Sequence, residues 1–369
     1  MWRYANPVDV TFGSGCLQRL PERLAGRRYA LVTYDDERFG RLADRVEALC
    51  APALLRLTDV QPNPDIATLA RADRRFATAR SAEVIVALGG GSVIDAAKVL
   101  AAARGDFERV RRHLFGGDQN LEPLPLIAIP TTAGTGSEVT CWATVWDRQA
   151  EKKHSLAHAR LYPEHALVDP ALTVGTPRDV TLAAGLDALS HALESLWNVN
   201  ANPVSSTLAV RAARSILEVL PRLVSALDDA ALREAMAGAS LFAGLAFSNT
   251  KTALAHSISY PITLRTGTAH GIACAFSLPQ VMRWARGADR ECDRALAAIF
   301  GSDIEAAAGQ LERFLEDLGV STAPSAYKLD DAGLQALVIE ALSGDRGRNF
   351  RGPIPDFAEE TQHPRSRAS

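Results

Sequence analysis

The feature that most constrains the fold of this chain is a series of short apolar runs separated by helical stretches. Four runs in the first half have the length and β-branched content of buried strands, at residues 29–33, 53–57, 84–88 and 126–130. The intervening segments are amphipathic, as at residues 65–80 and 93–103. Strands and helices in alternation predict a parallel sheet covered by helices.

The second half of the sequence has a different texture. After about Pro177, alanine and leucine dominate, and helical periodicity continues through Leu318. A turn-forming stretch at residues 172–177 separates the two textures. We therefore predict an α/β domain over residues 1–175 and an all-helical domain over residues 176–369, with an irregular tail from Gly344.

Composition excludes several classes of partner. The formal net charge is -3, which provides no basic surface for a nucleic-acid backbone. No apolar run approaches the length of a membrane span, and the first residues lack the layout of a signal peptide. The five cysteines are far apart and form no CxxC, which is typical of free thiols in a reducing compartment. We expect a cytoplasmic protein that binds neither nucleic acid nor membrane.

The third predicted strand runs directly into a glycine-rich loop, Gly89-Gly90-Gly91-Ser92, and a helix follows. Glycines let a phosphate approach the backbone, and a helix N-terminus offers unpaired N–H groups. We expect Ser92 to cap this helix. The loop departs from the GxGxxG pattern because Ile94 occupies the last glycine position. A simple glycine-rich turn is the alternative.

A second polar loop follows the fourth predicted strand, at residues 131–138. Ligands of open α/β sheets bind beyond the carboxyl ends of the strands. A long solvated loop is the alternative interpretation. Two such loops at successive strand ends favour a dinucleotide more strongly than either loop alone.

Four residues of the second half have the chemistry of a metal site. Asp187 and His191 lie four residues apart in a helical segment and therefore project from one face. His256 begins a second helical stretch, and His270 follows a turn marked by Gly267. One carboxylate and three imidazoles suit a divalent ion such as Fe(II). The alternatives are buried core histidines and a surface Asp–His ion pair.

Taken together, these motifs resemble the iron-containing alcohol dehydrogenase family, with a match from about Asn6 to Pro279. The segments that carry the resemblance are FGSG at 12–15, GGGSVIDAAK at 89–98, IPTTAGTGSE at 129–138, VDPALT at 168–173, GLDALSHALE at 185–194, and the pair His256 and His270.

The resemblance implies a Rossmann-like dinucleotide-binding domain followed by an all-helical metal-binding domain. It implies a metal-dependent dehydrogenase that uses Fe(II), or Zn(II) in its place, together with NADH or NADPH. The metal ligands would be Asp187, His191, His256 and His270. The cofactor-binding residues would be Gly89, Gly90, Gly91, Ser92, Asp95, Thr131, Thr132 and Thr135.

The sequence departs from the family pattern at three places. Tyr260 occupies a position where many members carry a further histidine, and it is our candidate catalytic residue, with a water or the ribose hydroxyls as the alternative proton donors. Tyr34 occupies the position of an aspartate that binds the ribose in NAD-preferring members, which leaves the choice between NAD and NADP open. The usual helical ending is replaced by the arginine-rich stretch 344–356.

The segments HSISYP and WRYANPV resemble the phosphonoacetaldehyde reductase branch of the family. This resemblance implies a small aldehyde substrate with a phosphonate group and a role in phosphonate biosynthesis, and we expect a homodimer. Guanidinium groups bind phosphonate oxygens bidentately. The candidate substrate-binding residues are Arg265, Arg346, Arg348, Asn349 and Arg351, with solvated surface arginines as the alternative.

Other functions stay open at this point. The substrate could be lactaldehyde, succinic semialdehyde or butyraldehyde. The same scaffold could also carry a sugar-phosphate dehydrogenase, a dehydroquinate synthase-like lyase, or a binding protein without activity. Net turnover of the nicotinamide cofactor would separate a dehydrogenase from the last two.

Overall fold

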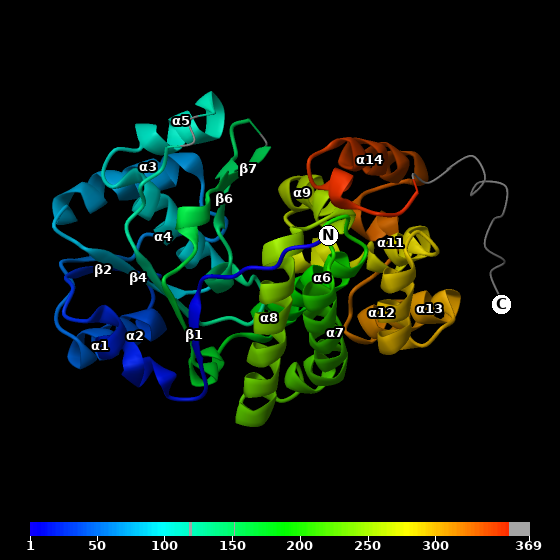
Figure 1. Cartoon of the computed structure of the whole chain (residues 1–369), viewed down its shortest axis with the longest axis horizontal. Helices are drawn as coiled ribbons and strands as arrows, with labels where there is room; N and C mark the ends of the chain where they lie inside the picture. The colour runs from blue at the N-terminus through cyan, green and yellow to red at the C-terminus, as the bar shows by residue number, and fades with distance from the viewer. Residues whose placement is uncertain (118–119, 151, 354–369) are drawn as a thin grey trace.

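A computed structural model of the chain describes residues 1–117, 120–150 and 152–353. The molecule has two lobes, with the sheet in one and most of the helices in the other (Figure 1). A six-stranded parallel sheet has the strand order β1-β8-β5-β4-β2-β3. Its strands are β1 (Asp9–Phe12), β2 (Tyr29–Val32), β3 (Leu55–Leu57), β4 (Val84–Gly89), β5 (Leu126–Pro130) and β8 (His165–Val168).

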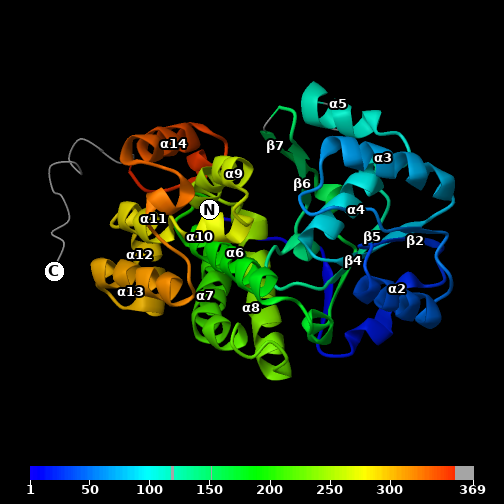
Figure 2. The same ribbon diagram turned by 180° about the vertical axis from the view of Figure 1, so that it is seen from behind.

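The strands form because their residues are apolar on both sides. In β2, Ala30 and Val32 pack on one face of the sheet, while Tyr29 and Leu31 pack on the other, as the period of two requires. Helices α3 (Ile66–Phe76) and α4 (Gly91–Ala103) cover the first face. Helices α1 (Leu20–Leu24) and α2 (Glu37–Leu49) cover the second face (Figure 2). Helix α5 (Glu108–Gly116) packs beside α4.

A hairpin extends the sheet lobe toward the helical lobe. It consists of β6 (Trp142–Asp147) and β7 (Lys152–Ala157), which pair antiparallel. Ala143, Val145 and Leu156 anchor it in the core that α3 and α4 share. In Figure 1 the hairpin lies between α4 and α9. Neither this hairpin nor β1 was predicted from the sequence.

The helical lobe is built around α6, α7 and α8, which pack against one another. Small residues such as Ala188, Ala212 and Ala243 are fully buried there and allow close approach of the helices. The helices are α6 (Arg178–Leu196), α7 (Pro203–Leu223), α8 (Ala230–Thr250), α9 (Leu254–Thr266), α10 (His270–Ala275), α11 (Leu278–Ala285), α12 (Arg290–Phe300), α13 (Ile304–Asp317) and α14 (Asp331–Ser343).

Seven short 3-10 helices complete the described elements: η1 (Cys16–Arg19), η2 (Ala77–Ala79), η3 (Ser137–Val139), η4 (Ala159–Leu161), η5 (Pro170–Thr173), η6 (Pro324–Tyr327) and η7 (Gly347–Asn349). All five cysteines are free thiols. The predicted fold class, a Rossmann-like sheet followed by a helical region, is confirmed. The part of the predicted tail beyond residue 353 lies outside the described residues.

One helix departs from the sequence-based expectation about apolar runs. By length and composition α8 could cross a membrane, although no such run was expected. In the fold, 61% of its most apolar window is buried inside the protein. Met236, Ala239 and Ala243 from this helix belong to the core of the helical lobe. These features are typical of a core helix.

Candidate metal centre and cofactor loops

Helix α6 places three polar side chains inside the protein. Asp187, His191 and Glu194 are spaced by four and three residues, so they lie along one face of the helix. All three are buried, and Glu194 is 0% exposed. Buried charged groups are costly unless they are paired or bind a cation. The helix therefore carries these residues for a reason other than packing.

The three candidate histidine ligands converge on one oxygen of Asp187. Asp187 Oδ1 lies 3.4 Å from His256 Nε2, 3.8 Å from His191 Nε2 and 4.0 Å from His270 Nε2. Asp187 Oδ1 and His256 Nε2 are buried and have no hydrogen-bond partner among the described residues. Four donors that share a cation at about 2.1 Å in tetrahedral directions stand about 3.4 Å apart. The donor set therefore fits a divalent metal ion.

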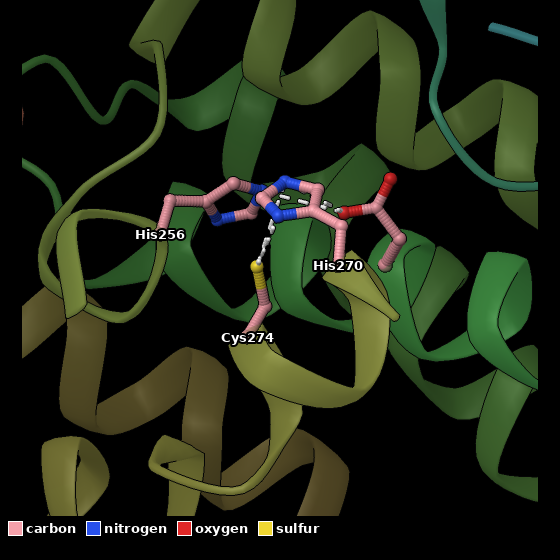
Figure 3. A group of neighbouring side chains, drawn as sticks. His256, His270 and Cys274 are labelled. Carbon is pink, nitrogen blue, oxygen red and sulfur yellow. Dashed lines mark hydrogen bonds and ion pairs between the residues drawn. The ribbon is translucent and has the colours of Figure 1, made fainter. Parts of the chain in front are cut away.

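The structure adds a residue that the sequence analysis missed. Cys274, on α10, lies with Asp187, His256 and His270 in a group whose candidate ligand atoms are all within 4.8 Å of one another. Its sulfur is 3.8 Å from His270 Nε2. In Figure 3, Cys274 points toward His256 and His270. Spacing alone could have found it, because Cys274 lies one helical turn after His270.

Glu194 holds His256 in the orientation that a metal ligand needs. Glu194 Oε2 lies 2.6 Å from His256 Nδ1 and also accepts the N–H of Ala253 at 2.9 Å. Glu194 Oε1 accepts the N–H of Ala255 at 2.5 Å and of His256 at 3.3 Å. Glu194 binds the Nδ1 side of His256 and so leaves Nε2 facing Asp187. Burial lowers the pKa of His256, but the charges of Cys274 and Glu194 and the contact with Asp187 outweigh it and hold the pKa well above its ordinary value, so a bound metal would displace a proton from Nε2.

Electrostatics prepare the remaining groups for metal binding. Burial, opposed by the charge of Asp187, lowers the pKa of His191 to about 4, so this imidazole is neutral near pH 7. Burial and then the charge of Lys153 hold the pKa of His270 well below its ordinary value. Burial raises the pKa of Asp187, but the nearby histidines outweigh it and the net shift is downward. Neutral imidazoles and an ionised carboxylate are the forms that bind metal.

Tyr260 lies beside this donor set with two cations against it. Its ring stacks on His270 with 5.7 Å between the ring centroids. Lys153 Nζ is 4.0 Å from the centre of the tyrosine ring, and the Arg346 guanidinium carbon is 5.1 Å from it. Tyr260 Oη is buried without a hydrogen-bond partner among the described residues. Burial raises the pKa of Tyr260, but the charges of Arg346 and Lys153 outweigh it and lower the pKa.

Of the candidate substrate residues, Arg346 contacts the ring of Tyr260, which in turn stacks on the metal-donor candidate His270. Arg348 pairs with Asp345, and Arg351 pairs with Asp289 at 2.7 Å. Asn349 Nδ2 donates to Thr252 O at 2.9 Å, and Arg265 is exposed at the end of α9. The polar ends of Arg348 and Arg351 are therefore engaged away from Tyr260.

The glycine loop lies where strand β4 gives way to helix α4. Gly90 is the N-cap of α4, and no side chain caps the helix. The expectation that Ser92 caps the helix is wrong, because the helix begins at Gly91 and Ser92 lies in its first turn. Ser92 Oγ instead accepts the N–H of Asn63 at 3.2 Å. The uncapped N–H groups of Gly91 and Ser92 are available to an anion.

The second polar loop packs directly on the glycine loop. A Cβ added at Gly91 would lie 2.5 Å from Thr135 Cγ2, and one added at Gly90 would lie 3.2 Å from Thr132 Oγ1. Only glycine permits this approach. Thr131 is buried, and its Oγ1 has no hydrogen-bond partner within the described chain. The two loops therefore meet at one place at the strand ends, which is lined by Gly90, Gly91, Thr132 and Thr135.

Two other candidate cofactor residues border this place. Tyr34 is half-buried, and its Oη would lie 3.7 Å from a Cβ at Gly90. Asp95 accepts Ser137 Oγ at 2.6 Å and the N–H of Thr144 at 2.8 Å, so both of its oxygens bind the protein itself. Asp95 thus ties helix α4 to the second loop.

The second loop also brings the strand ends next to the metal donors. A Cβ at Gly134 would lie 2.6 Å from the carbonyl oxygen of Ala184, on helix α6 one turn before the donor residues. The glycine loop, the threonine loop and the donor set are therefore contiguous. This arrangement suits a ligand that has phosphates at one end and a reacting group at the metal.

Comparisons with known proteins agree with this geometry. The sequence model described as "Iron-containing alcohol dehydrogenase" matches residues 7–170. The model described as "Fe-containing alcohol dehydrogenase family, C-terminal" matches residues 181–355.

Individual relatives cover most of the chain. Long-chain-alcohol dehydrogenase 1 of Geobacillus thermodenitrificans is 36% identical over 81% of this chain and 78% of its own length. Phosphonoacetaldehyde reductase of Streptomyces viridochromogenes is 35% identical over 83% of this chain and 80% of its own length. The crystal structure of sulfoacetaldehyde reductase from Bifidobacterium kashiwanohense in complex with NAD+ has a TM-score of 0.89 at 29% identity, covering 98% of this chain and 97% of that one.

A sheet lobe with a glycine loop and a helical lobe with a carboxylate–imidazole donor set define a metal-dependent oxidoreductase. The chain belongs to the iron-containing alcohol dehydrogenase family and is an enzyme that acts on alcohols.

Proposed function

We propose that this enzyme reduces phosphonoacetaldehyde to 2-hydroxyethylphosphonate. The observation that carries the substrate proposal is Arg346 beside Tyr260. Arg346 Nε donates to Thr252 Oγ1 at 2.9 Å, which fixes the side chain. The guanidinium has no carboxylate partner among the described residues, and it lies against the tyrosine that stacks on His270. A cation without a carboxylate partner, next to the tyrosine that stacks on His270, suits a substrate with an anionic group a short chain away from its carbonyl.

The metal in this proposal is Fe(II), with Zn(II) as the alternative, held by Asp187, His191, His256 and His270. When bound, such an ion supplies Lewis-acid polarisation of the carbonyl oxygen. The protein contributes the rest. Glu194 keeps His256 oriented, and the stacking of His191 on Phe247, with ring centroids 3.9 Å apart, keeps that imidazole in place.

The cofactor in this proposal is NADH or NADPH, bound by Gly89, Gly90, Gly91, Ser92, Thr131, Thr132 and Thr135, with Tyr34 and Asp95 bordering the site. The solved relative in complex with NAD+ supports NADH. The uncapped start of α4 would bind the pyrophosphate through backbone N–H groups. We assign residues 1–175 to this dinucleotide-binding domain and residues 176–369 to the metal-binding domain.

Reduction of the aldehyde adds a hydride to carbon and a proton to oxygen. We assign the proton to Tyr260 Oη, which is buried, has no hydrogen-bond partner among the described residues, and lies beside the donor set. The positive charges of Arg346 and Lys153 stabilise the tyrosinate that remains. Solvent then returns the proton to Oη, so the residue ends the cycle unchanged.

Initial rates test the proposed function. The metal-loaded enzyme is assayed at 340 nm with phosphonoacetaldehyde, sulfoacetaldehyde, lactaldehyde, succinic semialdehyde and butyraldehyde, each with NADH and NADPH. The proposal predicts the highest kcat/KM for phosphonoacetaldehyde. Equal or higher kcat/KM for butyraldehyde would contradict the substrate assignment and leave the family assignment intact.

Two arginine variants test whether Arg346 binds the substrate. Arg346→Gln should raise KM for phosphonoacetaldehyde by about 10- to 100-fold, since a charge-assisted hydrogen bond contributes about 1.5–3 kcal/mol. It should barely change KM for butyraldehyde. Arg222→Gln, at an exposed arginine at the end of α7, is the matched control and should change neither value.

The homodimer stays a prediction, which analytical ultracentrifugation would test.

A further inference from the structure

Lys153 is the second cation at Tyr260, and it comes from the other lobe. It lies on β7 of the hairpin, which belongs to the sheet lobe, whereas Tyr260 lies on α9 of the helical lobe. Lys153 Nζ is 4.0 Å from the centre of the Tyr260 ring. In Figure 1 the hairpin lies next to α9. The lysine therefore reaches the metal centre across the boundary between the lobes.

The charge of Lys153 is not neutralised by a neighbour. No carboxylate pairs with it within the described ranges 1–117, 120–150 and 152–353. Lys153 Nζ also lies 5.6 Å from the centre of the Trp146 ring. A half-buried ammonium without a counter-ion is unusual, because charged groups that leave water are normally paired. Here two such cations, Lys153 and Arg346, lie against one tyrosine ring.

We propose that Lys153 and Arg346 together form an anion-binding subsite for the head group of the substrate, with one cation from each lobe. This inference rests on the proposed function. The class of ligand is a dianionic head group such as a phosphonate, and binding of the head group joins the hairpin to α9. Neither cation alone matches a dianion, whereas the pair does.

The subsite explains why the enzyme should distinguish phosphonate from sulfonate. A phosphonate has a second ionisable proton that it loses near neutral pH, so it carries more than one negative charge there. A sulfonate carries a single negative charge. Loss of one cation should therefore weaken binding of the phosphonate more than binding of the sulfonate. The discrimination should narrow in a variant that lacks Lys153.

Two adjacent lysines allow a matched test. Lys152 is exposed on the same strand, and Lys153 is half-buried. Lys153→Gln should lower kcat for both aldehydes alike, because it removes a charge beside Tyr260, but it should raise KM about tenfold for phosphonoacetaldehyde and much less for butyraldehyde. Lys153→Arg should restore most of the lost affinity because it keeps the charge. Lys152→Gln should behave as wild type.

Binding of the product gives a second readout that does not depend on turnover. The apparent Kd for 2-hydroxyethylphosphonate, from calorimetry on metal-loaded enzyme, should rise about tenfold in Lys153→Gln and stay unchanged in Lys152→Gln. A merely structural lysine would alter KM for both aldehydes alike, and this result would overturn the inference. So would equal product affinity in wild type and Lys153→Gln. If wild type shows no preference for phosphonoacetaldehyde, the proposed function fails as well, whereas a preference that survives Lys153→Gln refutes the subsite alone.

Discussion

The contacts of Glu194 lead to a prediction that separates metal binding from folding. Glu194→Gln keeps the size of the side chain and removes its charge. The glutamate accepts hydrogen bonds from His256 Nδ1 and from three backbone N–H groups at the start of α9. Glutamine keeps one acceptor oxygen and adds an NH₂ group, which can donate to His256 Nδ1 and move the ring proton to Nε2. Nε2 would then have to lose this proton before it could bind a metal, which weakens metal binding.

The magnitude follows from the environment of the carboxylate. Glu194 is fully buried, so its hydrogen bond to His256, at 2.6 Å, is charge-assisted and shielded from water. Such a bond contributes about 1.5–3 kcal/mol, and about 1.4 kcal/mol corresponds to a factor of ten in affinity. We therefore expect Glu194→Gln to weaken metal binding about 10- to 100-fold, the range typical of groups that orient a metal ligand.

The assay is competition for Zn(II) against a chromogenic chelator, with urea unfolding of the metal-free proteins in parallel. Ser190→Ala is the matched control on α6, because among the described residues Ser190 Oγ donates to Leu186 O alone, at 2.8 Å. The control should bind Zn(II) as wild type does. If Glu194→Gln lowers only the unfolding free energy and keeps the wild-type metal affinity, Glu194 caps α9 without orienting His256, and the reasoning fails.

Three further predictions concern other parts of the chain. Gly91→Val should raise the Kd for NADH at least about tenfold at unchanged metal content in a fluorescence titration, because even a Cβ would lie 2.5 Å from Thr135 Cγ2; unchanged affinity would remove this loop from the cofactor site. Gly271→Ala should lower the unfolding free energy by about 3 kcal/mol, because the added Cβ would lie 1.9 Å from Ala183 O; a wild-type urea midpoint would contradict the packing. Burial raises the pKa of Asp73 to about 6, so its stabilising contribution is present below about pH 4 and is lost as pH rises through 6. The unfolding free energy of Asp73→Asn minus that of wild type should therefore increase by on the order of 2 kcal/mol as the pH rises from 4 to 7. Identical pH profiles of the two proteins would refute this.

The sequence predicted the central part of the sheet because those strands are buried on both faces. Runs such as those of β4 and β5 are continuously apolar, and the turns that follow them are rich in glycine and threonine. Strand β1 contains polar residues, and its partner β8 lies far along the chain. The strands β6 and β7 also mix polar and apolar residues, and they form a separate sheet. Period and composition do not identify such elements before the fold is known.

The donor residues were predicted because a helix fixes the spacing of Asp187 and His191 and the motifs supplied the rest. Lys153 could not be predicted in the same way. Its role depends on how the hairpin meets α9, which is a tertiary contact without a local signal. The arginines of the C-terminal stretch look alike in sequence, and only their partners in the fold separate Arg346 from Arg351.

We propose that the donor set around Asp187 holds a divalent metal on which aldehyde reduction depends. The most direct measurement is the rate of NADH oxidation with phosphonoacetaldehyde for enzyme stripped by a chelator and then titrated anaerobically with Fe(II), with bound metal counted at each point. We predict that the stripped enzyme is inactive and that the rate rises in proportion to bound iron up to one ion per chain. A metal-free enzyme that turns over at the full rate would contradict the claim.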